Sequence, residues 1–393
     1  MKQEHGFSLI ELMVSLVVLL IVVASATAAL VQAQHATDGV ALMANTQENL
    51  RAGMHFITRD LAQAGEGIPP AGISLPNNAA GVSAVKRPGT GGNFVETDGL
   101  TTYTLLPVIT PGSQLGQVAK SVNPQTGAIL TGINTDVINI LYADNTLIDP
   151  AGNNLNSYPI VQAAPAVPVC AGTINATGLT VALAAGCFQM PGAPTPIAIG
   201  NLILFTNQNG TALEYVTGVA GQVITFAAGD PAGLNQTGFP NGTVAKLANS
   251  GGGFPPTTIQ RVWMVTYYID STTNASKPQL IRQVNYPAYP TVAAATNPPQ
   301  QIADCLENLG FSYDISSSTA PAGTYAIGPG DAPQSVLPDT PAQFRAVNVF
   351  LAGRSEYTYL GSTQPQYFRN NLSTQVSLRS MAFQNQFNTT PVP

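Results

Sequence analysis

The chain has 393 residues and a net charge of −6, and only 9% of its residues are charged. Its few Lys and Arg residues are scattered, so the sequence predicts no nucleic-acid partner. It contains 37 glycines and 31 prolines, but Val, Ile, Leu, Tyr and Phe recur throughout, which argues against disorder. This length allows one large or two medium domains, and the composition is typical of an extracellular β-rich protein.

The first element is an apolar run, Phe7–Val31, that follows a short polar leader at residues 1–6. Glu11 is the only charged residue within it. About 20 apolar residues at ~1.5 Å each cross a hydrocarbon layer of ~30 Å. The run therefore predicts a membrane-spanning helix, with Lys2 on the cytoplasmic side.

Two other interpretations of this run remain open. A cleavable secretory signal would use the small residues of Ala24–Ala29 as its cleavage site, and a buried core helix would need a head shaped to enclose it. A plain signal anchor does not explain Glu11, because a charge inside the bilayer costs at least ~2.5–3.5 kcal/mol. This carboxylate is therefore a candidate functional residue that needs a partner.

The residues around the start of the run form a specific motif, Gly6-Phe7-Ser8-Leu9-Ile10-Glu11. It resembles the class III signal of type IV pilins and type II secretion pseudopilins. The resemblance implies that a prepilin peptidase cleaves between Gly6 and Phe7 and methylates the new amino terminus at Phe7. It also implies that Glu11 pairs with the Phe7 amine of a neighbouring subunit, which would fix the register between packed helices.

Beyond the membrane the helix continues, because apolar residues recur at three- and four-residue spacing from Leu42 to Ala64. Gly39 and Gly53 are expected weak points, and Gly65, Gly67 and Pro69-Pro70 are expected to end the helix. We therefore expect an α+β, pilin-like fold, in which a long N-terminal helix packs on an elaborated antiparallel β-rich head.

Strand-like runs alternate with turn residues after about residue 100. The expected strands are Tyr103–Ile109, Asp136–Tyr142, Ile197–Thr206, Glu214–Val219, Val223–Phe226, Val244–Leu247, Ile259–Ile269, Gln279–Val284, Gln301–Asp314, Phe344–Ala352 and Gln375–Phe383. The tyrosine-containing strand Ile259–Ile269 is expected to form a hairpin with Gln279–Val284. Residues 147–196 are expected to form an elaborated loop region.

The expected organisation has four parts: the leader, 1–6; the helix, 7–65, with 7–31 in the membrane; a first part of the head, 66–250, with Pro/Gly-rich loops; and a second part, 255–393. Gly251-Gly252-Gly253 is the linker candidate between the two parts of the head.

Later segments add to the family resemblance. The helix end, Arg51 to Gly65, resembles that of PilW-type minor pilins and of the related pseudopilin J of type II secretion. Strands Asp136–Tyr142 and Gly200–Phe205, the hairpin that ends in Leu280-Ile281-Arg282, and Val376–Arg379 resemble their sheet. These matches are less specific than the N-terminal motif.

The cysteines and histidines limit the chemistry. Cys170 and Cys187 bracket a short segment and are the expected disulfide, which leaves Cys305 as an odd thiol, either buried or paired between molecules. The histidines are His5, His35 and His55, so none lies beyond Gly65. We therefore expect no catalytic residues, no metal site and no cofactor, and hence no enzyme.

The resemblance implies a minor pilin of a type IV pilus that primes assembly or sits at or near the filament tip. Its expected partners are other major and minor pilins, which it contacts through the N-terminal helix, the prepilin peptidase/methyltransferase, and the inner-membrane assembly platform. It would be an inner-membrane protein before assembly, with a cytoplasmic N-terminus and a periplasmic head, and part of the extracellular pilus afterwards. The alternatives are a type II secretion pseudopilin and a membrane-anchored adhesin or binding module.

Overall fold

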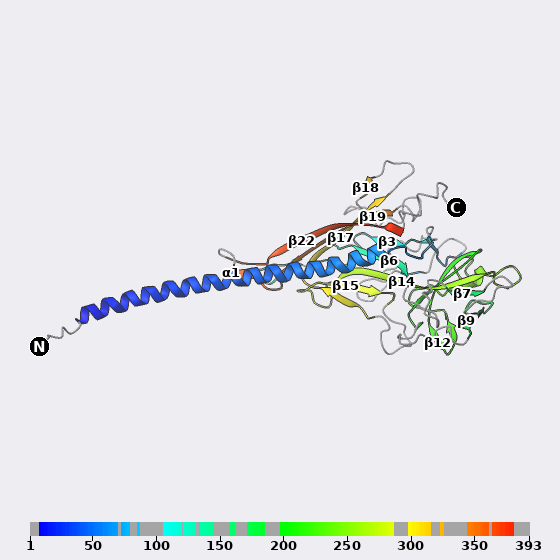
Figure 1. Ribbon diagram of the computed structural model, residues 1–393, viewed down its shortest axis with the longest axis horizontal. Coiled ribbons are helices and arrows are strands. Elements are labelled where there is room, and N and C mark those ends of the chain that lie inside the picture. The colour runs from blue at the N-terminus through cyan, green and yellow to red at the C-terminus, as the bar shows by residue number, and fades with distance from the viewer. Residues whose placement is uncertain are drawn as a thin grey trace.

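The computed structural model describes residues 8–69, 72–78, 85–86, 105–119, 121–130, 132, 134–144, 158–161, 171–184, 197–286, 298–315, 323–325, 344–360 and 364–380. Within them, one long helix projects from a β-rich head at the other end of the molecule (Figure 1). The strands that pair do so in antiparallel fashion, as the register of the paired residues shows. The expected α+β, pilin-like architecture is confirmed.

The helix α1 runs from Leu9 to Gln63, 55 residues, and is about 82 Å long at 1.5 Å per residue. It contains no proline, and it continues through both Gly39 and Gly53. It ends where predicted, because Gly65 has a φ of 80° and its N–H leaves the helix to bond Leu141 O at 2.9 Å.

Only the outer part of α1 is buried against the head. Its buried residues repeat at the predicted spacing and are Thr46, Leu50, Gly53, Met54, Ile57, Asp60 and Leu61. The apolar ones among them, Leu50, Met54, Ile57 and Leu61, belong to one hydrophobic core with residues of both large sheets, such as Leu280, Leu306 and Leu351. The predicted amphipathic extension is therefore confirmed, and its apolar stripe packs on the chain's own head.

The largest sheet is arranged around one long strand, β14, which spans Thr257–Asp270. Its direct neighbours are β6 (Val137–Ala143), β7 (Tyr158–Val161), β10 (Leu202–Asn207) and β15 (Gln279–Val284). The sheet continues outward through β3 (Ile109–Gly112), β11 (Gly210–Tyr215) and β16 (Gln300–Ala303). Strands from before and after the glycines at 251–253 thus pair directly in one sheet.

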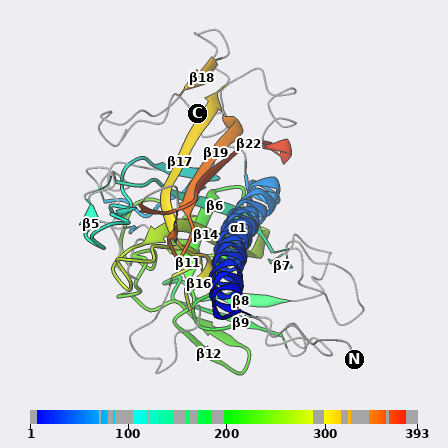
Figure 2. The same ribbon diagram turned by 90° about the vertical axis from the view of Figure 1, so that its left-hand side faces the viewer.

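A second sheet covers the helix together with the first. It has the order β18 (Gly323–Tyr325), β17 (Leu306–Ile315), β19 (Phe344–Arg354) and β22 (Arg369–Ser377). The helix contacts β19 and β22 of this sheet and β16 of the first. Figure 2 looks along the helix and shows it lying against both sets of strands.

A third, smaller sheet builds a separate core away from the helix. It consists of β8 (Gly172–Ile174), β9 (Thr180–Leu183), β12 (Gly218–Ala220) and β13 (Val223–Thr225). Its core includes Ile203 and Phe205 from β10, so β10 is shared between two hydrophobic cores. The remaining strands form two-stranded pairs: β1 (Ile73–Ser74) with β2 (Leu105–Leu106), β4 (Ser121–Val122) with β5 (Ile129–Leu130), and β20 (Tyr359–Leu360) with β21 (Pro365–Gln366).

Several predicted strands differ from the observed ones. Residues Val244–Leu247 form a 3₁₀-helix, η3, in which Val244 and Leu247 are buried. The run 301–314 is divided into β16 and β17, because Cys305 between them has a φ of 54° and turns the chain from one sheet into the other. The region 147–196, expected as loops, contains β7, β8 and β9.

Candidate functional site: the N-terminal helix and its attachment

The N-terminal half of α1 is an uncovered apolar rod. Residues 9–31 are all exposed, and an 18-residue window of the helix has a mean hydropathy of 2.8 with none of it buried. By length and composition this is the one helix in the described part of the chain that could cross a membrane. Such a surface is stable only in lipid or against other apolar helices.

Glu11 lies in the first turn of this rod, where the positive end of the helix dipole favours a carboxylate. The N–H of Ser8 faces Glu11 Oε2 at 3.5 Å, so the side chain turns back toward the start of the helix. No ion pair involves Glu11 within the described residues. Gly6 and Phe7, the predicted cleavage site, lie outside the residues that the structure describes.

The helix is attached to the head by a buried carboxylate, Asp60, whose side chain is 1% exposed. Arg282 of β15 donates to both of its oxygens, from Nε at 2.6 Å and from Nη2 at 3.2 Å. Tyr267 of β14 donates its hydroxyl to Oδ2 at 2.6 Å. One helix residue is therefore bound to two neighbouring strands by hydrogen bonds of the strong, charge-assisted kind.

Asp60 helps to raise the pKa values of the titratable groups around it. Burial works against the charge of Arg282, but the hydrogen bonds and the charge of Asp60 outweigh it and raise the pKa of the guanidinium. Burial, and next the negative charge of Asp60, raise the pKa of Tyr142 to about 12 and that of Tyr267 still further. The Arg282 guanidinium therefore stays charged, and the two phenols stay neutral, at physiological pH.

The sequence alone indicates no role for Asp60 or Arg282. Both lie in segments that resemble PilW-type proteins, namely the helix end up to Gly65 and the hairpin that ends in Arg282. The structure brings these segments together through the two side chains. A charged residue on the buried stripe of an amphipathic helix was the signal that could have indicated this contact.

Gly53 sets how closely the helix approaches the sheets. A Cβ atom at this position would lie 3.0 Å from Leu280 Cδ2 and 3.0 Å from Leu351 Cδ2, one in each large sheet. The helix continues through Gly53, and this glycine is a packing site between the two large sheets. Gly39 differs, since a Cβ there would meet nothing within 4 Å.

The predicted cysteine and histidine sites fall in different places. Cys170 and Cys187 lie outside the described residues. Cys305 is a free, buried cysteine, and burial raises the pKa of its thiol to about 11. His35 and His55 both lie on α1, and within the described residues no group of three or more His, Cys, Asp and Glu side chains could hold a metal ion.

Residues 1–27 match the family model of the prokaryotic N-terminal methylation motif. Together with the long apolar helix that follows, this motif fits a type IV pilin-like protein. More narrowly, it supports a pilin or pseudopilin type of subunit that is anchored in the inner membrane, processed by a prepilin peptidase and assembled with other pilins. This motif belongs to a family of structural proteins, not of catalysts. Searches of curated proteins and of solved structures gave no match.

Proposed function

We propose that this protein is a minor pilin of a type IV pilus, which primes assembly or sits at or near the filament tip. The observation that carries the proposal is Glu11, which lies within the matched methylation motif and is the one charged residue of the exposed apolar segment 9–31. Before assembly, residues 7–31 hold the chain in the inner membrane, with the N-terminus in the cytoplasm and the head in the periplasm.

Processing supplies the partner that Glu11 lacks. Cleavage between Gly6 and Phe7 creates a new amine four residues before Glu11, and methylation keeps this amine positively charged at neutral pH. A carboxylate in hydrocarbon is tolerated when it is paired and hydrogen-bonded. The amine of Phe7 on a neighbouring subunit meets this need, and the pairing sets the axial register of helices packed side by side in the filament.

The size of the head favours a minor subunit. Cleavage leaves 393 − 6 = 387 residues, of which 55 form the helix. Two large sheets pack on only the outer part of that helix, and a third sheet builds a separate core away from it. A head of this bulk is difficult to repeat along a thin filament, which supports low copy number and a place at or near its end. The resemblance to PilW-type minor pilins supports the same assignment.

A type II secretion pseudopilin is the second candidate, because the methylation motif is common to both kinds of subunit. The two kinds of subunit have the same fold but belong to different machines, so the genes that accompany this one distinguish them. Pilus genes beside this gene support the proposal, and secretion genes in their place would reassign the protein to the pseudopilins.

The charge of Glu11 can be tested against a carboxylate elsewhere on the same helix. Glu11→Leu is expected to leave membrane insertion intact and to abolish incorporation into sheared filaments, as followed by immunoblot. Glu48→Leu is the matched control, since Glu48 is exposed on α1 outside the apolar rod, and it is expected to assemble normally. Normal assembly of Glu11→Leu would show that the carboxylate does not set the register.

Processing is tested on the same material by mass spectrometry. The mature protein is expected to begin with N-methylated Phe7, and it should retain its full precursor mass in cells without prepilin peptidase. A mature chain that still starts at Met1 in peptidase-competent cells would contradict the proposed cleavage.

A further inference from the structure

The outer face of the second sheet differs in chemistry from its inner face. On the inner face, apolar residues of β17 and β19 belong to the core shared with α1, and Leu372 and Val376 of β22 pack against it. The register of the three strands places polar and small side chains on the other face, with one aromatic exception. Two adjacent rungs of this face are Gly310–Phe350–Ser373 and Ser312–Asn348–Gln375.

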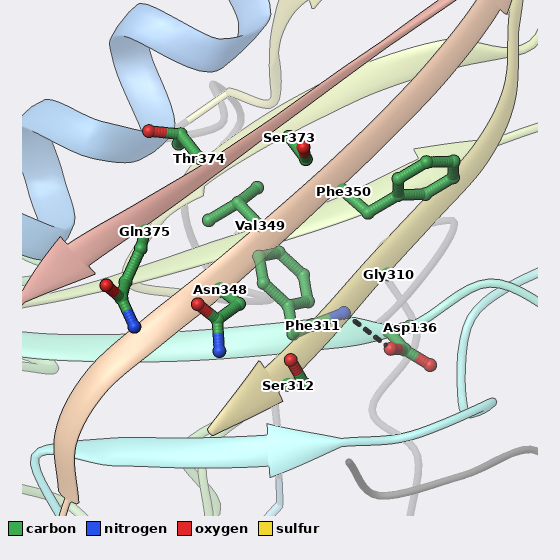
Figure 3. Close-up of a pocket in the computed structure, with 10 residues that line it drawn as sticks. All are labelled: Asp136, Gly310, Phe311, Ser312, Asn348, Val349, Phe350, Ser373, Thr374 and Gln375. Atoms are coloured by element: carbon green, nitrogen blue, oxygen red, sulfur yellow. Dashed lines mark hydrogen bonds between the residues drawn. The ribbon is translucent and has the colours of Figure 1, made fainter. Parts of the chain in front are cut away.

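These rungs border a hollow of about 580 Å³, shown in Figure 3. Phe350 is 37% exposed, although it lies in the middle strand of the three. Its neighbour on β17 is Gly310, where a Cβ would come no closer than 3.9 Å to any atom of Asp136 or Phe350. The absence of a side chain at Gly310 therefore opens space beside the ring, and part of the hollow follows from this single residue.

The amides on the next rung are held in place from one side. Asn348 Nδ2 donates to Asp314 Oδ1 at 3.1 Å, and Gln375 Nε2 donates to Asp314 Oδ2 at 2.6 Å. One N–H of each amide is engaged in this way, while neither amide oxygen has a hydrogen-bond partner among the described residues. Two oriented acceptors and the hydroxyls of Ser312 and Ser373 thus lie beside an exposed ring.

The charge around the hollow disfavours ionic ligands. No Lys or Arg is among the described residues that line it, so it provides nothing for an anion. The one lining carboxylate, Asp136, already accepts the N–H groups of Gln114 and Phe311, both at 2.8 Å. Burial also raises the pKa of Asp136, which weakens it further as a partner for a cation.

We propose that this hollow binds a neutral saccharide chain. A pyranose ring has an apolar face of C–H groups that stacks on an aromatic ring, and a rim of hydroxyls that donate to amide and hydroxyl oxygens. Phe350 supplies the stacking surface, and Asn348 and Gln375 supply oriented acceptors in the next rung. The site is open along the strands, so it suits a residue within a chain as well as a chain end. The proposal goes beyond a role in filament assembly, because it gives the head a ligand.

The test uses the full-length protein in a zwitterionic detergent, because detergents with sugar headgroups would compete. Cellohexaose, chitohexaose, maltohexaose and mannohexaose are titrated by calorimetry to about 5 mM, which detects the weak binding expected of an open site. At least one is expected to bind. Phe350→Ala is expected to weaken that binding about tenfold or more, and Gly310→Val, which fills the hollow, is expected to abolish it.

The controls separate the site from the rest of the head. Tyr357→Ala removes another exposed aromatic ring, 65% exposed and absent from the hollow, and should leave binding unchanged. Thermal unfolding shows that each variant is folded. Failure of all four oligosaccharides to bind overturns the proposal, and so does binding that survives both Phe350→Ala and Gly310→Val in folded protein. Binding of heparin in place of the neutral chains also overturns it.

Discussion

Asp60 of the helix and Arg282 of strand β15 are 222 residues apart in the sequence and form a buried, two-point ion pair. The pair joins α1 to the head, and Tyr267 completes it from the neighbouring strand. Because the surroundings of Asp60 are buried, the pair stabilises the attachment only as long as both partners are present.

Replacement of either partner alone is expected to destabilise the protein strongly. Asp60→Ala leaves the buried guanidinium without its carboxylate, and we expect a loss of about 3–5 kcal/mol in the free energy of unfolding. The double replacement Asp60→Leu with Arg282→Met removes both charges and should cost far less than the sum of the single changes. Denaturant unfolding of all variants in the same detergent measures this.

An exposed pair provides the matched control for that experiment. Lys277 and Glu356 form an ion pair in which the side chains are 39% and 33% exposed. Lys277→Ala is expected to change stability far less than Asp60→Ala, because exposed ion pairs are screened by water and contribute little. An Asp60→Ala variant that is no less stable than Lys277→Ala would show that the buried pair does not hold the helix on the head.

The two glycines of α1 are expected to respond in opposite directions to alanine. Gly39→Ala adds a methyl group where nothing lies within 4 Å, so it should favour the helix by about 1 kcal/mol. Gly53→Ala forces that methyl against Leu280 and Leu351 at 3.0 Å, so overpacking should cost about 1–3 kcal/mol. Thermal unfolding of both variants distinguishes the two; equal stabilisation by both would refute the packing role of Gly53.

Glu214 is expected to give the head a stability that increases on mild acidification. Burial raises its pKa well above 4.5, while the Val244 N–H opposes this and the charge of Asp230 adds to it. The folded state therefore binds a proton more tightly than the unfolded state. Stability is expected to fall as pH rises from about 4.5 through the raised pKa. Glu214→Gln should be more stable than the wild type at neutral pH and lose this advantage near pH 4.5.

Asp270 supplies a comparison of opposite sign. Burial works against its ionisation, but hydrogen bonds from Thr273 and Thr272 outweigh burial and lower its pKa. The stability that Asp270 contributes to the folded state is therefore fully present above about pH 3.8, and it is lost as pH falls through the lowered pKa. Asp270→Asn should be less stable than the wild type at neutral pH. Unfolding curves at several pH values that show the same trend for Asp270→Asn and Glu214→Gln would contradict both assignments.

The proposed disulfide between Cys170 and Cys187 can be detected by thiol labelling. The hairpin β8–β9 pairs Gly172 with Leu183, and the N–H of Ala184 donates to Ala171 O at 2.8 Å. Cys170 directly precedes Ala171 in the sequence, and Cys187 follows three residues after Ala184. The paired ends of this hairpin therefore lead into the two cysteines, which supports the proposed disulfide. Such a crosslink would close a loop of roughly 17 residues and stabilise the fold by about 3 kcal/mol.

The labelling is expected to proceed in three stages. The folded protein should take up no alkylating label, since Cys305 is buried and its pKa is raised to about 11. Unfolding without reductant should expose one thiol, Cys305, and reduction should expose all three. Three labelled cysteines before reduction would rule out the disulfide.

The helix was predictable from the sequence because its signals are local. Its apolar run, its three- and four-residue spacing and the glycines at its end all lie within the helix or next to it, and the structure ends α1 at Gln63. The hairpin of β14 and β15 was predictable for the same reason. Its two strands are adjacent in the sequence and separated by turn residues.

Features that depend on distant residues were not predictable in this way. The apolar residues of 244–247 predicted a strand. Val244 and Leu247 are indeed buried, but the segment forms a 3₁₀-helix. Cys305 gave no local sign of its positive φ, which divides one apparent strand between two sheets. For Gly53, spacing along the helix could not reveal the leucines that approach it from two sheets. The structure at each of these three places depends on tertiary contacts, which the spacing of apolar residues along the sequence does not reveal.

The central position of β14 also sets the order in which the head can fold. Its neighbour β6 is far earlier in the chain, and Asn139 contacts Thr266 across 127 residues. During synthesis, β6, β7 and β10 emerge first and remain without their shared neighbour until residues 257–270 follow. The largest sheet must therefore close late, through contacts of high sequence separation, which makes folding slow. Until then, unpaired strand edges are exposed outside the membrane, and the nascent head is at its most vulnerable to proteases and to aggregation.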